Sequence, residues 1–217
     1  MKISPSIISC DLSHLATEIM KCEDAGVEMF HLDVMDGHFV PNLTMGPDLV
    51  RAVRRVTDRT LEAHLMLERP DRYFRQFLSA GADILLLHYE SPVDLKGTME
   101  AIRNEGGRCG IVVNPETDVS KAFPFLEHCE ILLVMSVHPG FSGQSFIPSS
   151  LENVKKARRY IDEHGLGVEI EIDGGINDRT ARMAIEAGAD ILVSASYIFG
   201  GNVKERIRAL RSVTASQ

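Results

Sequence analysis

Residues 80–85 read Ala-Gly-Ala-Asp-Ile-Leu, and residues 187–192 repeat the same six amino acids. A shorter form, Ala25-Gly26-Val27, stands near the N-terminus. Glycine at this place suits the left-handed residue that ends a helix, and the apolar residues that follow suit a strand. The three glycines lie at positions 26, 81 and 188, close to multiples of a unit of about 27 residues. The repeat therefore indicates one helix-to-strand junction used several times.

Short apolar runs rich in valine, isoleucine and leucine recur along the whole chain, and each precedes a longer amphipathic stretch. Strands that alternate with helical patterns are typical of βαβ units in a parallel sheet. Eight runs in 217 residues predict an α/β protein, a single-domain (β/α)8 TIM barrel over residues 1–217. The predicted strands are Ile3–Ile8, Met29–Met35, Leu61–Met66, Ile84–His88, Cys109–Val113, Ile131–Val137, Val168–Ile172 and Ile191–Ala195.

The competing architecture is an open, doubly wound sheet. Such a sheet carries a G-x-G-x-x-G motif after its first strand. Residues 3–11 contain no glycine, so the barrel is preferred.

Composition and charge restrict the possible partners. Hydrophobic residues make up 44% of the chain and charged residues 25%, as in ordinary soluble proteins. The net charge of −8 disfavours nucleic acid and anionic membrane surfaces as partners. The four scattered cysteines form no C-x-x-C motif, and the N-terminus lacks the apolar stretch of a signal peptide. No segment has about 18 continuous apolar residues. We therefore expect a cytoplasmic protein.

Polar residues interrupt the predicted strands on one face. Alternation places His31, Asp33 and Met35 together on the second strand, and His64 and Met66 together on the third. The full inward set is Ser6, His31, Asp33, Met35, His64, Met66 and Asp173. A lone strand histidine is usually a satisfied core residue, but buried carboxylates are costly unless they are paired or bind a metal. Two imidazoles and two carboxylates predict one divalent metal ion: zinc, manganese, iron or cobalt.

Small residues follow the last three predicted strands. Pro139-Gly140-Phe141-Ser142-Gly143-Gln144 follows the sixth, Gly174-Gly175 the seventh, and Ser194-Ala195-Ser196 ends the eighth. Clustered glycine lets backbone N–H groups converge on an anion, and late barrel loops commonly bind phosphate. We therefore predict a phosphate site in these loops.

Other residues carry weaker signals. No lysine ends a predicted strand, which disfavours a Schiff-base aldolase. His14, His128 and His164 fall in helical stretches and are expected at the surface. His88 and Glu90, which close the fourth strand, are expected either to support the metal group or to form a polar rim.

These motifs closely resemble the ribulose-phosphate 3-epimerase family. The resemblance runs from Ile3 to about Gly200. It rests on Ser4–Ile7, His31–Asn42, His64–Met66, Asn114–Thr117, Val134–Val137 with Pro139–Phe141, and Asp173–Ile176. Members are (β/α)8 barrels with a ribulose-phosphate-binding type of phosphate site. They interconvert D-ribulose 5-phosphate and D-xylulose 5-phosphate. The resemblance thus implies carbohydrate metabolism in the pentose phosphate pathway and a homo-oligomer, a dimer or a hexamer.

The resemblance also implies roles for individual residues. His31, Asp33, His64 and Asp173 would bind the metal, and Asp33 and Asp173 would also transfer the proton at C3. Ser6 and His64 would touch substrate, and Met35 and Met66 would line the pocket. Phosphate would lie on residues 140–143, which are Gly140, Phe141, Ser142 and Gly143, with Gly174, Gly175, Ala195 and Ser196.

Three positions depart from the family pattern. His138 stands where asparagine is usual, Ser142 where glycine is frequent, and Ala195-Ser196 where Gly-Ser is frequent, so that Ala195 replaces the glycine. Two alternatives therefore stay open: a D-allulose-6-phosphate 3-epimerase, and a barrel that binds a sugar phosphate without turnover. Residues 173–176 and Met45-Gly46-Pro47 look more like the pentulose enzyme.

Overall fold

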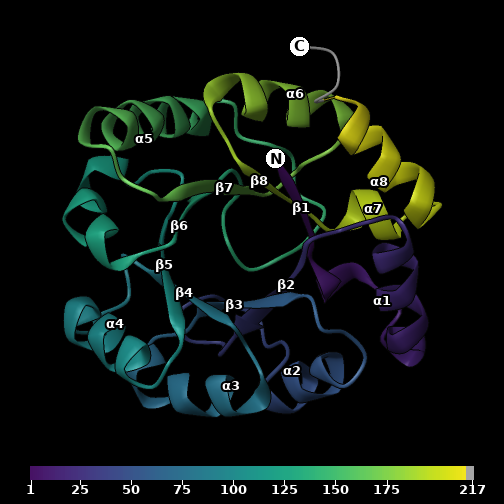
Figure 1. Ribbon diagram of the computed structural model, residues 1–217, viewed down its shortest axis with the longest axis horizontal. Helices are drawn as coiled ribbons and strands as arrows, with labels where there is room; N and C mark the ends of the chain where they lie inside the picture. The colour runs from purple at the N-terminus through teal and green to yellow at the C-terminus, as the bar shows by residue number, and fades with distance from the viewer. Residues whose placement is uncertain (214–217) are drawn as a thin grey trace.

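The computed structural model describes residues 1–213, and they form one barrel of eight parallel strands. Figure 1 shows the strands as an inner ring with the helices outside it. The predicted (β/α)8 barrel is confirmed. The strands are β1 (Lys2–Pro5), β2 (Met29–Met35), β3 (Thr60–Met66), β4 (Ile84–His88), β5 (Arg108–Val113), β6 (Ile131–Met135), β7 (Glu169–Asp173) and β8 (Ile191–Ser194).

The strands pair in the order β1-β8-β7-β6-β5-β4-β3-β2. Between β1 and β2 a single parallel bridge, Ser6 with His31, nearly closes the ring. Because all eight strands run the same way, the residues at their carboxyl ends meet at one mouth of the barrel.

The predicted alternation of side chains is present. On β2, Phe30, Leu32 and Val34 pack in the main core outside the ring. Met29 packs in the core inside the ring, so His31, Asp33 and Met35, which share its face, point inward as well. The inner core consists of Met29, Ile84, Leu86, Val112, Ile131, Leu133, Met135, Val137 and Ile191.

The helices do not follow the strands one to one. Two 3-10 helices, η4 (Val119–Lys121) and η5 (Phe123–His128), occupy the place after β5, where the regular pattern expects an α-helix. Pro124 lies in the first turn of η5, where its missing N–H costs no intrahelical hydrogen bond. The α-helices are α1 (Leu15–Asp24), α2 (Pro47–Arg54), α3 (Phe74–Ala80), α4 (Leu95–Asn104), α5 (Ser150–His164), α6 (Asp178–Ala187), α7 (Ser196–Phe199) and α8 (Val203–Ser212).

The first strand is shorter than predicted. The prediction of Ile3–Ile8 is wrong beyond Pro5, because the 3-10 helix η1 (Ile7–Ser9) begins there. The Ser6 side chain caps this helix by accepting a hydrogen bond from the backbone N–H of Ile8. Two further 3-10 helices are η2 (Leu12–His14) and η3 (Pro70–Arg72).

The repeated hexapeptide forms the junctions α3–β4 and α6–β8. Gly81 and Gly188 end the helices with φ of 106° and 110°, a conformation that favours glycine. An added Cβ would lie 2.6 Å from Cγ of Arg54 at the first site and 2.7 Å from Cγ of Arg158 at the second. Glycine is therefore required both for its backbone conformation and for the close approach of an arginine.

The aspartate of each repeat ties its strand to the preceding unit. Asp83 Oδ2 accepts hydrogen bonds from Arg54 Nη2 at 2.7 Å and from the backbone of Leu61 at 2.8 Å. Asp190 Oδ2 accepts from Arg158 Nη1 at 3.0 Å and from the backbone of Ile170 at 2.8 Å. At each junction the aspartate of the repeat thus holds one helix and one strand.

Glu28, after the shorter repeat, makes the equivalent contacts at the point where the ring closes. Its Oε1 accepts from Arg211 of α8 at 2.9 Å, and its Oε2 accepts from the backbone of Ile3 at 3.2 Å. The third junction therefore fastens the last helix to the first strand. None of the helices within residues 1–213 combines the length and apolar character needed to cross a bilayer.

Candidate active site and metal centre

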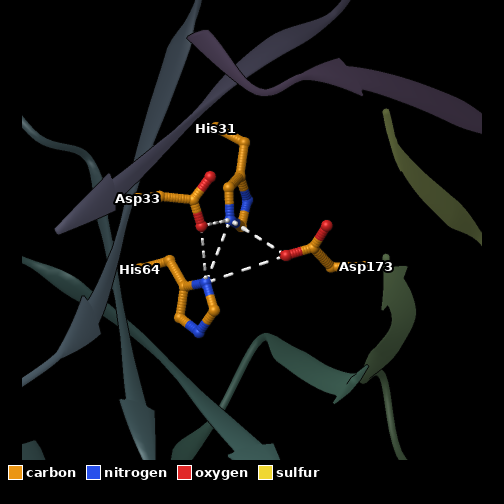
Figure 2. A group of neighbouring side chains, drawn as sticks. All are labelled: His31, Asp33, His64 and Asp173. Carbon is orange, nitrogen blue, oxygen red and sulfur yellow. Dashed lines mark hydrogen bonds and ion pairs between the residues drawn. The ribbon is translucent and has the colours of Figure 1, made fainter. Parts of the chain in front are cut away.

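Four ionisable side chains meet at the carboxyl end of the barrel (Figure 2). His31 and Asp33 come from β2, His64 from β3, and Asp173 is the last residue of β7. Parallel pairing sets Asp33 directly beside His64. The structure therefore brings together all four residues predicted to bind a metal.

The donor atoms of this group have the spacing of a metal site. His31 Nε2 lies 3.1 Å from His64 Nδ1 and 3.3 Å from Asp33 Oδ1. Asp173 Oδ2 lies 3.8 Å from His31 Nε2 and 3.9 Å from His64 Nδ1. Bonds of a tetrahedral zinc ion would set its donor atoms about 3.3 Å apart. The two nitrogens and two oxygens therefore fit a divalent ion with little movement.

The two aspartates have different protonation properties. Burial opposes ionisation of Asp33, but the charge and hydrogen bonds of His31 and His64 hold its pKa well below the ordinary value. At Asp173, burial and then the Asp33 carboxylate raise the pKa to about 7. Like charges at close range separate the pKa values of a pair in this way. Near neutral pH the site thus contains one ionised carboxylate and one that readily exchanges a proton.

The two histidines also differ. Burial disfavours the charged form of His31, yet Asp33, Glu171 and Glu62 raise its pKa well above the ordinary value. At His64 burial dominates and lowers the pKa to about 4, although a hydrogen bond to Asp33 opposes this. Metal binding would therefore release a proton from His31, because a coordinating imidazole must be neutral.

A layer of polar side chains lies beneath His31 in the barrel. Glu62 Oε1 accepts a hydrogen bond from the Ser4 hydroxyl at 2.6 Å and lies 2.8 Å from His31 Nδ1. Glu171 Oε1 lies 3.6 Å from the same nitrogen. Since Glu62 is ionised, with a pKa that His31 holds low despite burial, it accepts the proton of His31 Nδ1. This leaves His31 Nε2 to face the metal group.

Glu62 and Glu171 are two further buried carboxyls that received no role from the sequence. Both are fully buried, and Glu62 Oε2 and both Glu171 oxygens have no hydrogen-bond partner among residues 1–213. Burial and the Glu62 carboxylate raise the pKa of Glu171 well above its ordinary value, so one of the two carboxyls keeps a proton. The period-2 alternation that identified His64 and Asp173 also places Glu62 and Glu171 inside, and it was the signal available for them.

The outer nitrogen of His64 contacts a further polar pair. His64 Nε2 lies 2.8 Å from His88 Nε2, and His88 Nδ1 lies 3.3 Å from Glu90 Oε2. His88 is buried, and Glu90 is partly exposed. His88 and Glu90 were expected either to support the metal group or to form a polar rim. The contact with His64 favours the first role for His88.

A cavity of about 300 Å³ adjoins this group, and Asp33 and Asp173 line it. This is within the range of small-molecule sites. Its wall contains most of the residues predicted to touch substrate, namely Asp33, Met35, Met66, Gly140, Phe141, Ser142, Gly143, Asp173, Gly174, Gly175, Ala195 and Ser196. Pro139 and Gln144, from the loop predicted to bind phosphate, also line it. The remaining wall residues, which received no site role from the sequence, are Ile8, Met135, Val137, Ile176, Asn177, Val193 and Tyr197. Met135 was detectable, because it shares the inward face of β6.

Two predicted substrate contacts lie behind the cavity wall. Ser6 is buried and donates a hydrogen bond to Asp33 Oδ2 at 2.5 Å. His64 is fully buried beside Asp33. Neither is among the residues that line the cavity, so their contact with substrate stays a prediction.

The late loops have the backbone shape expected of an anion site. Gly140, Gly143, Gly174 and Gly175 all have positive φ. A Cβ at Gly175 would lie 2.6 Å from the backbone nitrogen of Phe146, so only glycine fits where these two loops meet. All four glycines line the cavity together with Ser196 at the start of α7.

His138, one of the departures from the family pattern, lies outside the cavity wall. Its side chain is exposed, and Nδ1 lies 3.0 Å from Glu116 Oε1. The departures Ser142 and Ala195 do line the cavity. Ser142 Oγ is hydrogen-bonded to Ser9 Oγ at 2.8 Å, which joins the loops after β6 and β1.

Comparison with known proteins gives a consistent result. A family described as "Ribulose-phosphate 3 epimerase family" matches residues 2–199. The chain is 44% identical to a ribulose-phosphate 3-epimerase of Bacillus subtilis (strain 168), covering 100% of both proteins. It is 43% identical to one of Chlamydia muridarum, covering 96% of this chain and 94% of that protein. The crystal structure of 3-hexulose-6-phosphate synthase from Salmonella typhimurium covers 99% of both chains with a TM-score of 0.76 at 18% identity, which supports the fold.

The raised pKa of Asp173 predicts a pH-dependent stability of the metal-free protein. The folded-state pKa is about 7, whereas an unfolded aspartate has a pKa of about 3.9. Between these values the folded state holds a proton that the unfolded state lacks, so this stabilisation is complete below about pH 4 and is lost as the pH rises through 7. As the pH rises through this range, the free energy of unfolding of chelated wild type should therefore fall by up to about 4 kcal/mol relative to that of Asp173→Asn.

Urea denaturation of both proteins at several pH values measures this difference. Asp48→Asn, at an exposed position, controls for loss of a carboxylate. A constant difference between wild type and Asp173→Asn from pH 4 to pH 8 would contradict the prediction.

Proposed function

The chain belongs to the ribulose-phosphate 3-epimerase family, and on this premise we propose that it interconverts D-ribulose 5-phosphate and D-xylulose 5-phosphate. It is an isomerase of the ribulose-phosphate 3-epimerase type. The observation that carries the proposed chemistry is the pair Asp33 and Asp173, two carboxyls from β2 and β7 that line one cavity. Inversion at C3 needs one group to remove a proton and another to return one to the opposite face.

His31, Asp33, His64 and Asp173 would hold one divalent ion, zinc, manganese, iron or cobalt. When bound, the ion supplies Lewis-acid stabilisation of the negative charge that develops on the substrate oxygens, worth several kcal/mol. The spacing of the donor atoms and their burial support this assignment.

The two aspartates share the proton transfer. Asp33 is held ionised by its histidine neighbours and accepts the C3 proton from one face of the substrate. Asp173 donates a proton to the other face. In the reverse direction the roles exchange. Because each carboxyl serves one face, the planar enediolate needs no rotation within the cavity.

Methionine side chains would form the wall of the cavity beside the reacting carbons. Met35, Met66 and Met135 are almost fully buried and line the cavity. Their thioethers have no proton to donate, so they do not compete with the two aspartates in proton transfer. An apolar wall also excludes water and strengthens the electrostatic contacts of the intermediate.

The substrate phosphate would bind at the late loops. The backbone N–H groups of Gly143, Gly175 and Ser196 are proposed as donors, because these residues line the cavity and carry no side-chain charge. The wider site comprises Gly140, Phe141, Ser142, Gly143, Gly174, Gly175, Ala195 and Ser196.

The pentulose phosphate ranks above the two alternatives. His138, the departure that raised the allulose 6-phosphate alternative, lies outside the cavity wall and pairs with Glu116. A barrel that only binds a sugar phosphate would have no need of two carboxyls with separated pKa values. A small-molecule ketose phosphate is therefore the proposed partner. The homo-oligomer and the cytoplasmic location stay predictions.

Turnover with the two ketose phosphates tests the proposed function. The protein should epimerise D-ribulose 5-phosphate faster than D-allulose 6-phosphate. Exhaustive chelation should abolish activity, and zinc, manganese, iron or cobalt should restore it. Faster turnover of the hexulose phosphate would favour the alternative enzyme. Full activity in protein shown by elemental analysis to lack metal would end the metal assignment.

Exchanging either aspartate tests the division of proton transfer. Asp33→Asn and Asp173→Asn should each slow epimerisation by about 10²–10⁴-fold, because one positioned proton carrier is lost. One of the two variants should still exchange the C3 hydrogen of a single epimer with deuterated water. The metal content of each variant must be measured, and Asp48→Asn is the matched surface exchange. Near wild-type inversion by a metal-replete variant would refute the mechanism.

A charge placed in the late loops tests the phosphate site. Ser196 is exposed at the first position of α7, where an acidic residue is compatible with the helix. Ser196→Asp should raise the KM for ribulose 5-phosphate at least about 10-fold through charge repulsion and weaken inhibition by inorganic phosphate in parallel. Ser196→Ala, which keeps the backbone N–H, should change neither. An unchanged KM in a folded Ser196→Asp protein would place the phosphate elsewhere.

A further inference from the structure

His64 uses its two ring nitrogens in opposite directions. Nδ1 faces the proposed metal group, 3.1 Å from both Asp33 Oδ1 and His31 Nε2. Nε2 faces away from that group, toward His88 Nε2 at 2.8 Å. A neutral imidazole has one proton for these two positions. A nitrogen that binds a metal has none, so the proton of a ligating His64 must stand on Nε2.

The contact between the rings transmits this requirement to His88. The ring centroids lie 5.0 Å apart and the planes differ by 19°, so the two imidazoles meet nearly edge to edge. In this geometry an N–H on one ring points at the lone pair of the other. If His64 donates from Nε2, His88 Nε2 must accept, and the proton of His88 then stands on Nδ1.

Glu90 is oriented to receive that proton. Its Oε1 accepts hydrogen bonds from the backbone N–H of Asn114 at 3.0 Å and from the Thr117 hydroxyl. These two donors turn Oε2 toward His88 Nδ1, at 3.3 Å. A carboxylate oxygen can only accept, so it favours the tautomer of His88 with the proton on Nδ1.

We propose that Glu90 and His88 are positioning residues that hold His64 in the tautomer with a bare Nδ1, ready to bind metal. This inference rests on the proposed metal site. Glu62 does the same for His31 by direct contact, whereas His64 needs a relay because its outer nitrogen meets another imidazole. The opposite tautomer would set a bare His88 Nδ1 against the Glu90 carboxylate. In the metal-free protein the bare His64 Nδ1 has a donor in His31 Nε2, 3.1 Å away, which offsets its contact with Asp33 Oδ1.

The exchange Glu90→Gln tests the relay with almost no change of shape. Asn114 and Thr117 donate to the oxygen on one side, so the introduced amide keeps its carbonyl there and turns its NH₂ group toward His88 Nδ1. His88 must then accept at Nδ1 and carry its proton on Nε2. His64 must accept in turn at Nε2 and carry its proton on Nδ1, where the metal would bind.

We expect Glu90→Gln to bind zinc about 10- to 100-fold more weakly in a chelator competition, the range found for partners of ligating histidines. His88→Gln should stay within about threefold of wild type, because its amide can accept from His64 and donate to Glu90. Glu68→Gln, an exposed exchange after β3, controls for the lost charge.

The tautomers are read directly by ¹⁵N NMR of the imidazole nitrogens in metal-free protein at pH 8. Wild type should carry the His64 proton on Nε2, and Glu90→Gln should carry it on Nδ1. A wild-type His64 protonated on Nδ1 overturns the proposal even if the variant fails to fold. Unchanged zinc affinity in Glu90→Gln also overturns the proposal, as does a weaker zinc affinity in that variant with the His64 proton still on Nε2. Failure of wild type itself to bind zinc would instead count against the proposed metal site.

Discussion

The apolar interior of the barrel makes each ionisable group inside it depend on a partner. Removal of a carboxylate or an imidazolium from water costs several kcal/mol unless another group supplies compensating charge or hydrogen bonds. Leu86, Leu133 and Ile191 pack in the inner core, and the side chains of His31 and His64 are fully buried. The arrangement of His31, Asp33, His64 and Asp173 follows from this constraint, because each of the four lies within contact distance of an opposite charge or a hydrogen-bond donor.

The same desolvation gives the two aspartates their different properties. Asp33 contacts both histidines and the Ser6 hydroxyl, so its ionised form is compensated. Asp173 lies farther from the histidines and close to the charge of Asp33, so its neutral form is favoured up to a pKa of about 7. Two chemically identical side chains therefore differ in pKa through position alone.

Two carboxylates outside the metal group support the proposed histidine ligands. Glu62 contacts His31 directly, whereas Glu90 contacts His88, which in turn contacts His64. These outer contacts require strands in fixed register, since His31 lies opposite Glu62 and Asp33 opposite His64. The junctions at Glu28, Asp83 and Asp190 fasten the neighbouring strand pairs β1–β2, β3–β4 and β7–β8, because each carboxylate holds a helix to the backbone of the preceding strand. The repeat in the sequence is thus part of what positions the site.

Local patterns in the sequence were sufficient for the barrel and for the four proposed ligands. A strand turns alternate side chains to opposite faces wherever it lies, so the spacing of His31 and Asp33 already placed both inside. Tertiary structure alone decided which partners those residues meet. The sequence does not reveal that Glu62 lies under His31, that His88 meets His64, or that Asp173 rather than Asp33 has the raised pKa. It also does not reveal that the first strand stops at Pro5. The physical reason is that side-chain alternation depends on neighbours in the chain, whereas contacts and pKa values depend on the register between strands and on the depth of burial.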